Sequence, residues 1–201
     1  MSTIEQHDGQ APSSSSERPA WHLPAARAAV AVPVGVAVTF LQAHDARVGL
    51  AAFAVLALGT GAALLVLRRG VPVAVARFPL VAGATGVLAG VVAAGLAAAA
   101  PSGDALKVVV AAWALVTAVV EGWAWLRLRA TTDLRMRRIA ADWRAVAVLT
   151  LAAGIAFALL PVHDVVLVGL LGAYAIVVGV FHGIAAASAR IVAKDAREAT
   201  R

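Results

Sequence analysis

Six long apolar stretches, separated by short polar segments, constrain the fold of this 201-residue chain more than any other feature. A helix needs about 20 apolar residues to cross the roughly 30 Å hydrocarbon core of a bilayer. Read between charged residues, the stretches are Ala28–Ala43, Val48–Leu67, Phe78–Ala100, Val108–Leu126, Ala145–Val162 and Val165–Ala189. Hydrophobic residues make up 62% of the chain, against about 45–50% in a soluble domain. None of the stretches alternates as a barrel strand does. The sequence therefore predicts an all-α integral membrane protein with six transmembrane helices.

The short connections predict that consecutive helices pair as three antiparallel hairpins, residues 25–69, 78–129 and 143–190. Residues 1–24 are polar and rich in serine and proline, which predicts a disordered cytoplasmic tail. Residues 191–201 are expected to form a short basic cytoplasmic tail.

The first stretch is the shortest and contains Pro33. It reaches a full span only if it includes Leu23–Arg27, with the Arg27 side chain extended toward the membrane surface.

The basic residues predict the orientation. Three turns on one side of the membrane, Ala43–Arg47, Pro101–Lys107 and Pro161–Asp164, contain only Arg47 and Lys107 of the 17 Lys and Arg residues. Because basic loops stay in the cytoplasm, both termini are expected there. This distribution accounts for the net charge of +6 without any nucleic-acid partner.

The longest connection, Arg129–Trp143, has two interpretations. It is either a solvated loop that sets orientation, or a short surface helix that rests on anionic lipid headgroups through Arg135, Arg137 and Arg138. The two interpretations are compatible. Three tryptophans fit a cytoplasmic aromatic belt: Trp123, Trp125 and Trp143.

An internal repeat is visible in the second half of the chain. Residues Ala112–Arg129 align without gaps with Ala173–Arg190, which pairs Trp113 with Tyr174 and Glu121 with His182. The second stretch aligns more loosely. Three copies of one hairpin, related by an axis near the membrane normal, are the simplest explanation.

These residues resemble a family. The run Trp113–Thr117, followed by Glu121 and by Leu126–Arg129, resembles the fourth helix of HdeD-like membrane proteins, and Gly169–Gly179 resembles their sixth. The resemblance covers about Leu80–Arg190. It implies a small multi-pass protein of the bacterial inner membrane, built from three similar hairpins and associated with stress responses such as acid resistance. It carries over no enzymatic activity, ligand or cofactor.

Small residues recur at four-residue spacing in two stretches. Gly86 and Gly90 precede Ala94, and Gly179 and Gly183 precede Ala187, so each set lies on one helix face. Such faces allow close helix approach in lipid. They serve either packing within one chain or contact between two copies, and both uses stay open.

Glu121 and His182 are the two strongly polar titratable residues well inside the stretches, at similar heights in the cytoplasmic half. A charged group in hydrocarbon is unfavourable by about 2.5–3.5 kcal/mol on insertion scales, so both side chains are expected to face the protein interior. One interpretation is a Glu–His pair that passes a proton or binds a small polar solute. The other is two separately satisfied polar groups.

The outer turns contain His44-Asp45 and His163-Asp164, which we interpret as solvated turn residues and helix caps rather than a metal site. The sequence contains no recognisable catalytic motif. We therefore expect a non-enzymatic membrane protein without a cofactor, which associates with lipid, with its own copies or with other membrane proteins. The alternatives are a small transporter or channel with its polar site at Glu121 and His182 and, less favoured, a membrane enzyme.

Overall fold

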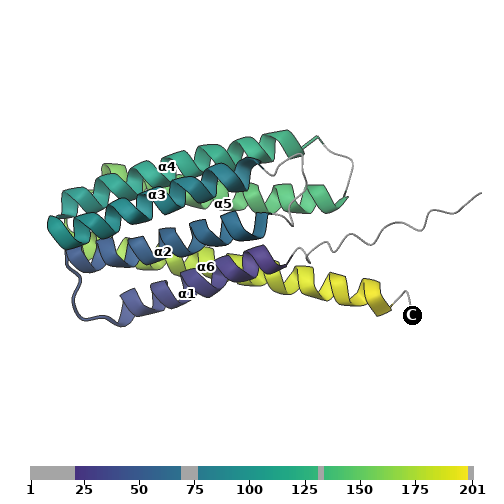
Figure 1. Ribbon diagram of the computed structural model, residues 1–201, viewed down its shortest axis with the longest axis horizontal. Coiled ribbons are helices and arrows are strands. Elements are labelled where there is room, and N and C mark those ends of the chain that lie inside the picture. The colour runs from purple at the N-terminus through teal and green to yellow at the C-terminus, as the bar shows by residue number, and fades with distance from the viewer. Residues whose placement is uncertain (1–20, 69–76, 131–133, 199–201) are drawn as a thin grey trace, which may run out of the picture.

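The computed structural model describes residues 21–68, 77–130 and 134–198, and these residues form a bundle of six helices (Figure 1). The helices are α1 (His22–Phe40), α2 (Ala46–Leu67), α3 (Arg77–Ala99), α4 (Gly103–Leu128), α5 (Leu134–Leu159) and α6 (Asp164–Glu198). All six contain a segment long and apolar enough to cross a membrane. The predicted all-α membrane fold is confirmed. Most of the predicted disordered tail at residues 1–24 lies outside the described residues, but its last three residues, His22–Pro24, are helical and begin α1, so the tail was predicted too long.

Two helices extend furthest beyond their predicted bounds. α5 begins at Leu134, so the described part of the Arg129–Trp143 connection is mainly the first turns of a membrane-spanning helix, and not a separate surface helix. α6 continues to Glu198, so the predicted tail beyond residue 190 is helical as far as it is described. Hydropathy marks where a helix enters lipid, whereas the helix itself continues into water as long as its backbone hydrogen bonds are satisfied.

Two of the helices, α2 and α4, start at a residue whose side chain caps them. The Asp45 carboxylate accepts a hydrogen bond from the Val48 backbone N–H at 2.9 Å, and the Ser102 hydroxyl accepts one from Ala105 at 3.1 Å. Each cap satisfies a backbone donor that has no partner inside the helix. α1 continues through Pro33, which the helices of a membrane bundle tolerate.

The closest helix pairs differ from the predicted hairpins. α1 packs most extensively on α6, α3 on α2, and α5 on α4, whereas the hairpin partners α1–α2, α3–α4 and α5–α6 are in smaller contact. The three even-numbered helices also contact one another. The same arrangement, one odd-numbered helix packed mainly on one even-numbered helix, therefore recurs three times around the bundle. The repeat in the sequence itself stays a prediction.

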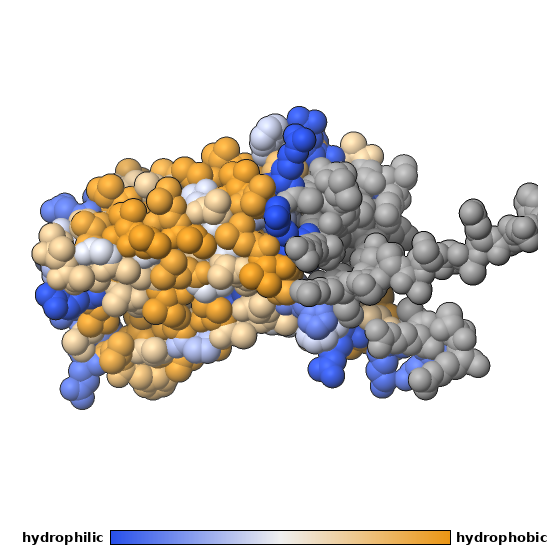
Figure 2. Space-filling model, viewed as in Figure 1, coloured by the Kyte–Doolittle hydropathy of each residue, from blue (hydrophilic) through white to orange (hydrophobic). Residues whose placement is uncertain are grey.

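Figure 1 places the start of α1 and the end of α6 at the same end of the bundle. Figure 2 shows a broad apolar band across the visible face, with hydrophilic residues at both ends of it. Exposed apolar side chains of this band come from several helices, for example Val55, Leu88 and Val119. This is the surface that a membrane-spanning bundle presents to lipid.

Candidate functional site

A buried ion pair lies inside the bundle. The Arg27 Nη2 atom on α1 donates a hydrogen bond to Glu121 Oε1 on α4 at 3.2 Å, and the two side chains are only 13% and 7% exposed. α1 begins at His22, so Arg27 stands within the second turn of a helix that packs between α2 and α6. The expectation that Arg27 extends toward the membrane surface is therefore wrong. Its side chain turns inward because a buried carboxylate in hydrocarbon requires a cationic or hydrogen-bonding partner.

Glu121 and His182 both lie in the protein interior, with 5% and 6% of their surface exposed. Each follows the first residue of its helix, Gly103 or Asp164, by the same number of positions, so the two stand at similar heights. Within the described residues no hydrogen bond joins them. The contact partner of Glu121 is Arg27, and a functional Glu121–His182 pair stays a prediction.

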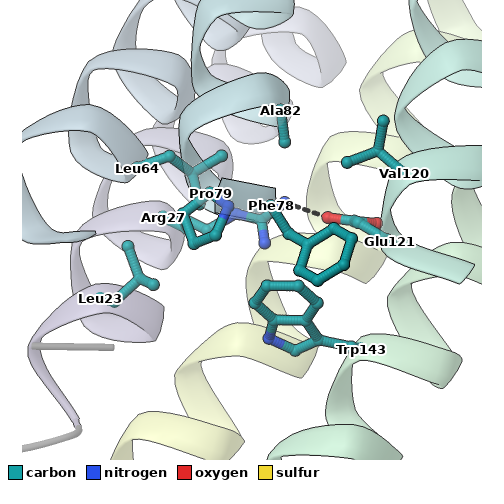
Figure 3. Close-up of a pocket in the computed structure, with 9 residues that line it drawn as sticks. All are labelled: Leu23, Arg27, Leu64, Phe78, Pro79, Ala82, Val120, Glu121 and Trp143. Atoms are coloured by element: carbon teal, nitrogen blue, oxygen red, sulfur yellow. Dashed lines mark hydrogen bonds and ion pairs between the residues drawn. The ribbon is translucent and has the colours of Figure 1, made fainter. Parts of the chain in front are cut away.

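Two small cavities flank Arg27. One, of about 20 Å³, is lined by Arg27 and Glu121 together with Leu23, Phe78 and Trp143, among others (Figure 3). The other, of about 10 Å³, is lined by Arg27 and His182 together with Thr60 and Tyr174, among others. Arg27 borders both cavities, so it connects the surroundings of Glu121 with those of His182.

Aromatic side chains cover the cavity beside Glu121. Phe78 on α3 lies edge-to-face with Trp143 on α5 and with Trp123 on α4, at ring-centroid distances of 6.2 and 5.6 Å. In Figure 3, Phe78 and Trp143 lie side by side next to the Arg27–Glu121 pair. Of the tryptophans of the predicted aromatic belt, Trp143 therefore borders the cavity itself, and Trp123 packs on Phe78, which also borders it.

A second polar contact lies deeper, where the hydroxyl groups of Thr150 on α5 and Tyr174 on α6 are 3.0 Å apart. Trp113 packs edge-to-face on Tyr174 and on Phe53, with centroid distances of 6.1 and 5.2 Å. Beyond this layer, toward the N-terminal ends of α2, α4 and α6, the interior is apolar. Its fully buried side chains include Leu50, Phe53, Leu106, Phe157, Leu167 and Leu171.

The predicted small-residue faces lie against neighbouring helices of the same chain. On α3, a Cβ atom at Gly86 would be 3.1 Å from the Ala57 carbonyl oxygen, and one at Gly90 would be 2.9 Å from the Leu58 nitrogen, both on α2. On α6, a Cβ atom at Gly179 would be 2.9 Å from the Val32 nitrogen on α1. Gly183 has more room, since its nearest neighbour is the Ala28 Cβ at 4.0 Å. Three of the four glycines thus allow close backbone contact within one chain.

Of the three arginines expected at lipid headgroups, Arg137 is exposed in the first turns of α5. The side chains of Arg135 and Arg138 lie outside the described residues. Other arginines stand over tryptophan rings: Arg127 over Trp123, Arg129 over Trp125, and Arg190 over Trp21, at 5.3, 5.8 and 5.7 Å.

The turns before α2 and α6 meet, but not through histidines. An Asp164 carboxylate oxygen accepts a hydrogen bond from the Ala46 backbone N–H at 3.1 Å, so Asp164 holds the start of α2 against the start of α6. The ring of His44 instead lies 3.3 Å from the Gln42 carbonyl oxygen of its own turn. In the described part of the chain, no three metal-binding side chains gather.

Arg27 is the residue of this site that sequence reasoning missed. One signal was available: Glu121 lies within an apolar stretch that offers it no partner, and the first stretch reaches full length only by including Arg27. The sequence does not indicate that α1 lies near α4 at the height of Glu121, because close packing decides which helices become neighbours.

No protein-family model, no curated protein and no solved structure matches this chain in the comparisons with known proteins.

Proposed function

We propose that this multi-pass membrane protein is a non-enzymatic, HdeD-like protein of the bacterial inner membrane, with both termini in the cytoplasm, which acts by association with lipid or other membrane proteins. The proposal rests on one observation: the interior of the bundle is closely packed and offers little room for a ligand, which leaves the surface for association. The glycine faces are used for packing inside the chain, and the cavities at the buried polar residues have room for about one water molecule each.

The exposed apolar band is the surface that remains for association. The basic residues support the orientation, since Arg127, Arg129 and Arg190 are exposed near the end of the bundle where α1 starts and α6 ends. The residues Trp113–Thr117 and Gly169–Gly179 support the family assignment.

The test combines purification in a mild detergent, mass measurement and crosslinking in membranes. A photo-crosslinking amino acid at the exposed Val180 is expected to capture lipid, a second copy or another membrane protein. The same amino acid at Phe157, which is fully buried, is the matched control and is expected to capture neighbouring helices only. A strictly monomeric protein that recovers neither lipid nor protein would contradict the proposal.

One observation favours a second function, a small transporter or channel with its polar site at Glu121 and His182. In the part of the chain that the structure describes, Glu121 Oε2, Arg27 Nε and His182 Nε2 are buried without a hydrogen-bond partner. Ionisable groups inside a membrane are candidates for proton or solute pathways. Proton flux into liposomes that contain the protein, lost in Glu121→Gln, would support this function. Flux equal to that of empty liposomes would exclude proton movement.

A further inference from the structure

Three unpaired polar atoms meet at one place in the bundle. Glu121 Oε2, Arg27 Nε and His182 Nε2 come from α4, α1 and α6, and each is buried without a hydrogen-bond partner among the described residues. Leaving such an atom unpaired costs about 1–3 kcal/mol, and more for a charged group. Most buried polar atoms in folded proteins are paired with protein or with ordered water. Three unpaired atoms on residues that line two cavities, with Arg27 lining both, therefore require an explanation.

The two cavities have the size and lining that water requires. A site for one water needs at least about 10–15 Å³ and two to four polar partners. The cavity of about 20 Å³ borders Arg27 and Glu121, and the cavity of about 10 Å³ borders Arg27, His182, Thr60 and Tyr174. The first is large enough for one water, and the second is at the lower limit.

The polar atoms around the second cavity leave lone pairs and protons available. The Thr60 hydroxyl donates its proton to the Leu56 carbonyl oxygen at 2.6 Å, so its oxygen can accept a hydrogen bond from the cavity. His182 Nε2 donates or accepts, according to the tautomer of the ring. A water molecule here therefore has three candidate partners: Thr60, Tyr174 and His182.

Access differs between the two ends of the bundle. The interior toward the starts of α2, α4 and α6 is filled by fully buried apolar side chains, including Phe53 and Phe157. At the opposite end, the cavity beside Glu121 is bordered by Leu23, Phe78 and Trp143, and all three are partly exposed. These side chains stand between the site and that end of the bundle.

We propose that Arg27, Glu121 and His182 form a hydrated site that binds one water molecule in each cavity. The first water bonds to Glu121 Oε2, and the second bonds to His182 Nε2 and to Thr60. Arg27 borders both cavities and donates a hydrogen bond to each water. Water and Arg27 then join Glu121 and His182 into one hydrogen-bonded network that opens only at the end of the bundle where α1 starts. This inference does not depend on either proposed function.

Radiolytic hydroxyl-radical footprinting of the full chain in lipid nanodiscs tests the inference, because radicals formed from bound water modify the side chains beside it. After correction for intrinsic reactivity and for the 6% exposure of His182, this residue is expected to be modified several-fold faster than Phe53 and Phe157, which are fully buried. Equal modification of all three would overturn the inference.

A cavity-filling variant locates the water. Thr60→Met is expected to reduce the modification of His182 to the level of Phe53, whereas Ala158→Met, on an exposed face of α5, leaves it unchanged. Modification of His182 that persists in folded Thr60→Met protein would overturn the assignment to this cavity. If Thr60→Met does not fold, magnetisation transfer from water to the labelled His182 ring in the unaltered protein replaces it. Its absence would overturn the inference.

Discussion

Arg27 and Glu121 are 94 residues apart in the chain, yet their side chains form an ion pair at 3.2 Å in the interior of the helix bundle. The pair joins α1 to α4, two helices that the sequence assigns to different hairpins. It also places the Arg27 side chain beside the two cavities that border Glu121 and His182.

The ion pair predicts that the stability losses caused by substituting Arg27 and Glu121 singly will not add up in the double variant. Arg27→Met leaves an uncompensated buried carboxylate and is expected to lower the free energy of unfolding by about 3–5 kcal/mol. The double variant Arg27→Met/Glu121→Met removes both charges and is expected to recover most of that loss. Reversible unfolding in detergent measures both changes. Lys194→Met, which breaks the exposed ion pair with Glu198, is the control and is expected to have little effect. Equal losses in single and double variants would contradict a paired site.

Close contact between α2 and α3 predicts that alanine substitution of two glycines will change the stability of the protein very differently. A Cβ atom at Gly61 would be 2.8 Å from both the Gly83 carbonyl oxygen and the Val87 nitrogen, whereas one at Gly95 meets nothing within 4 Å. Gly61→Ala is expected to lower stability by about 1–3 kcal/mol through overpacking. Gly95→Ala is expected to be neutral or stabilising by up to about 1 kcal/mol, because alanine favours the helix. Thermal unfolding of the two variants checks this, and equal effects would exclude close α2–α3 packing at Gly61.

Asp164 connects the turns before α2 and α6. Its side chain is expected to contribute more to the free energy of unfolding than the side chain of an exposed acidic residue does. Asp164→Ala removes the acceptor for the Ala46 backbone N–H and should cost about 1 kcal/mol, as for the loss of a helix cap. Asp104→Ala changes an exposed acid in the first turn of α4 and serves as the matched control. Chemical unfolding of both variants measures the difference. A loss no larger than that of Asp104→Ala would mean that the Asp164–Ala46 bond does not stabilise the fold.

The proposed orientation predicts which thiols are reachable from outside the cell. The chain contains no cysteine, so a single substitution introduces the only thiol. Ala100→Cys and Ala130→Cys place it at exposed positions at the two ends of α4. A membrane-impermeant maleimide is expected to label Ala100→Cys in intact cells and Ala130→Cys only after the membrane is permeabilised, because basic segments stay in the cytoplasm. The opposite pattern would reverse the proposed topology.

The positions of the six helices followed from hydropathy, and both Glu121 and His182 lie in the interior as their polarity required. The largest errors in the helix bounds occur where helices leave the apolar region. Leu134 begins α5 and Glu198 ends α6 because helical hydrogen bonding continues past the lipid boundary, which a hydropathy pattern does not record.

The sequence by itself determined that this chain is an all-α membrane protein, because the transfer of apolar and charged side chains into hydrocarbon is a property of each residue and sums along the chain. Only the tertiary structure decided which residues meet. α1 packs most closely on α6 rather than on α2, and this arrangement places Arg27, not His182, against Glu121. The reason is physical: lipid is as apolar as the helix surfaces, so helix partners are chosen by close packing and by the pairing of buried polar groups, which depend on several helices at once.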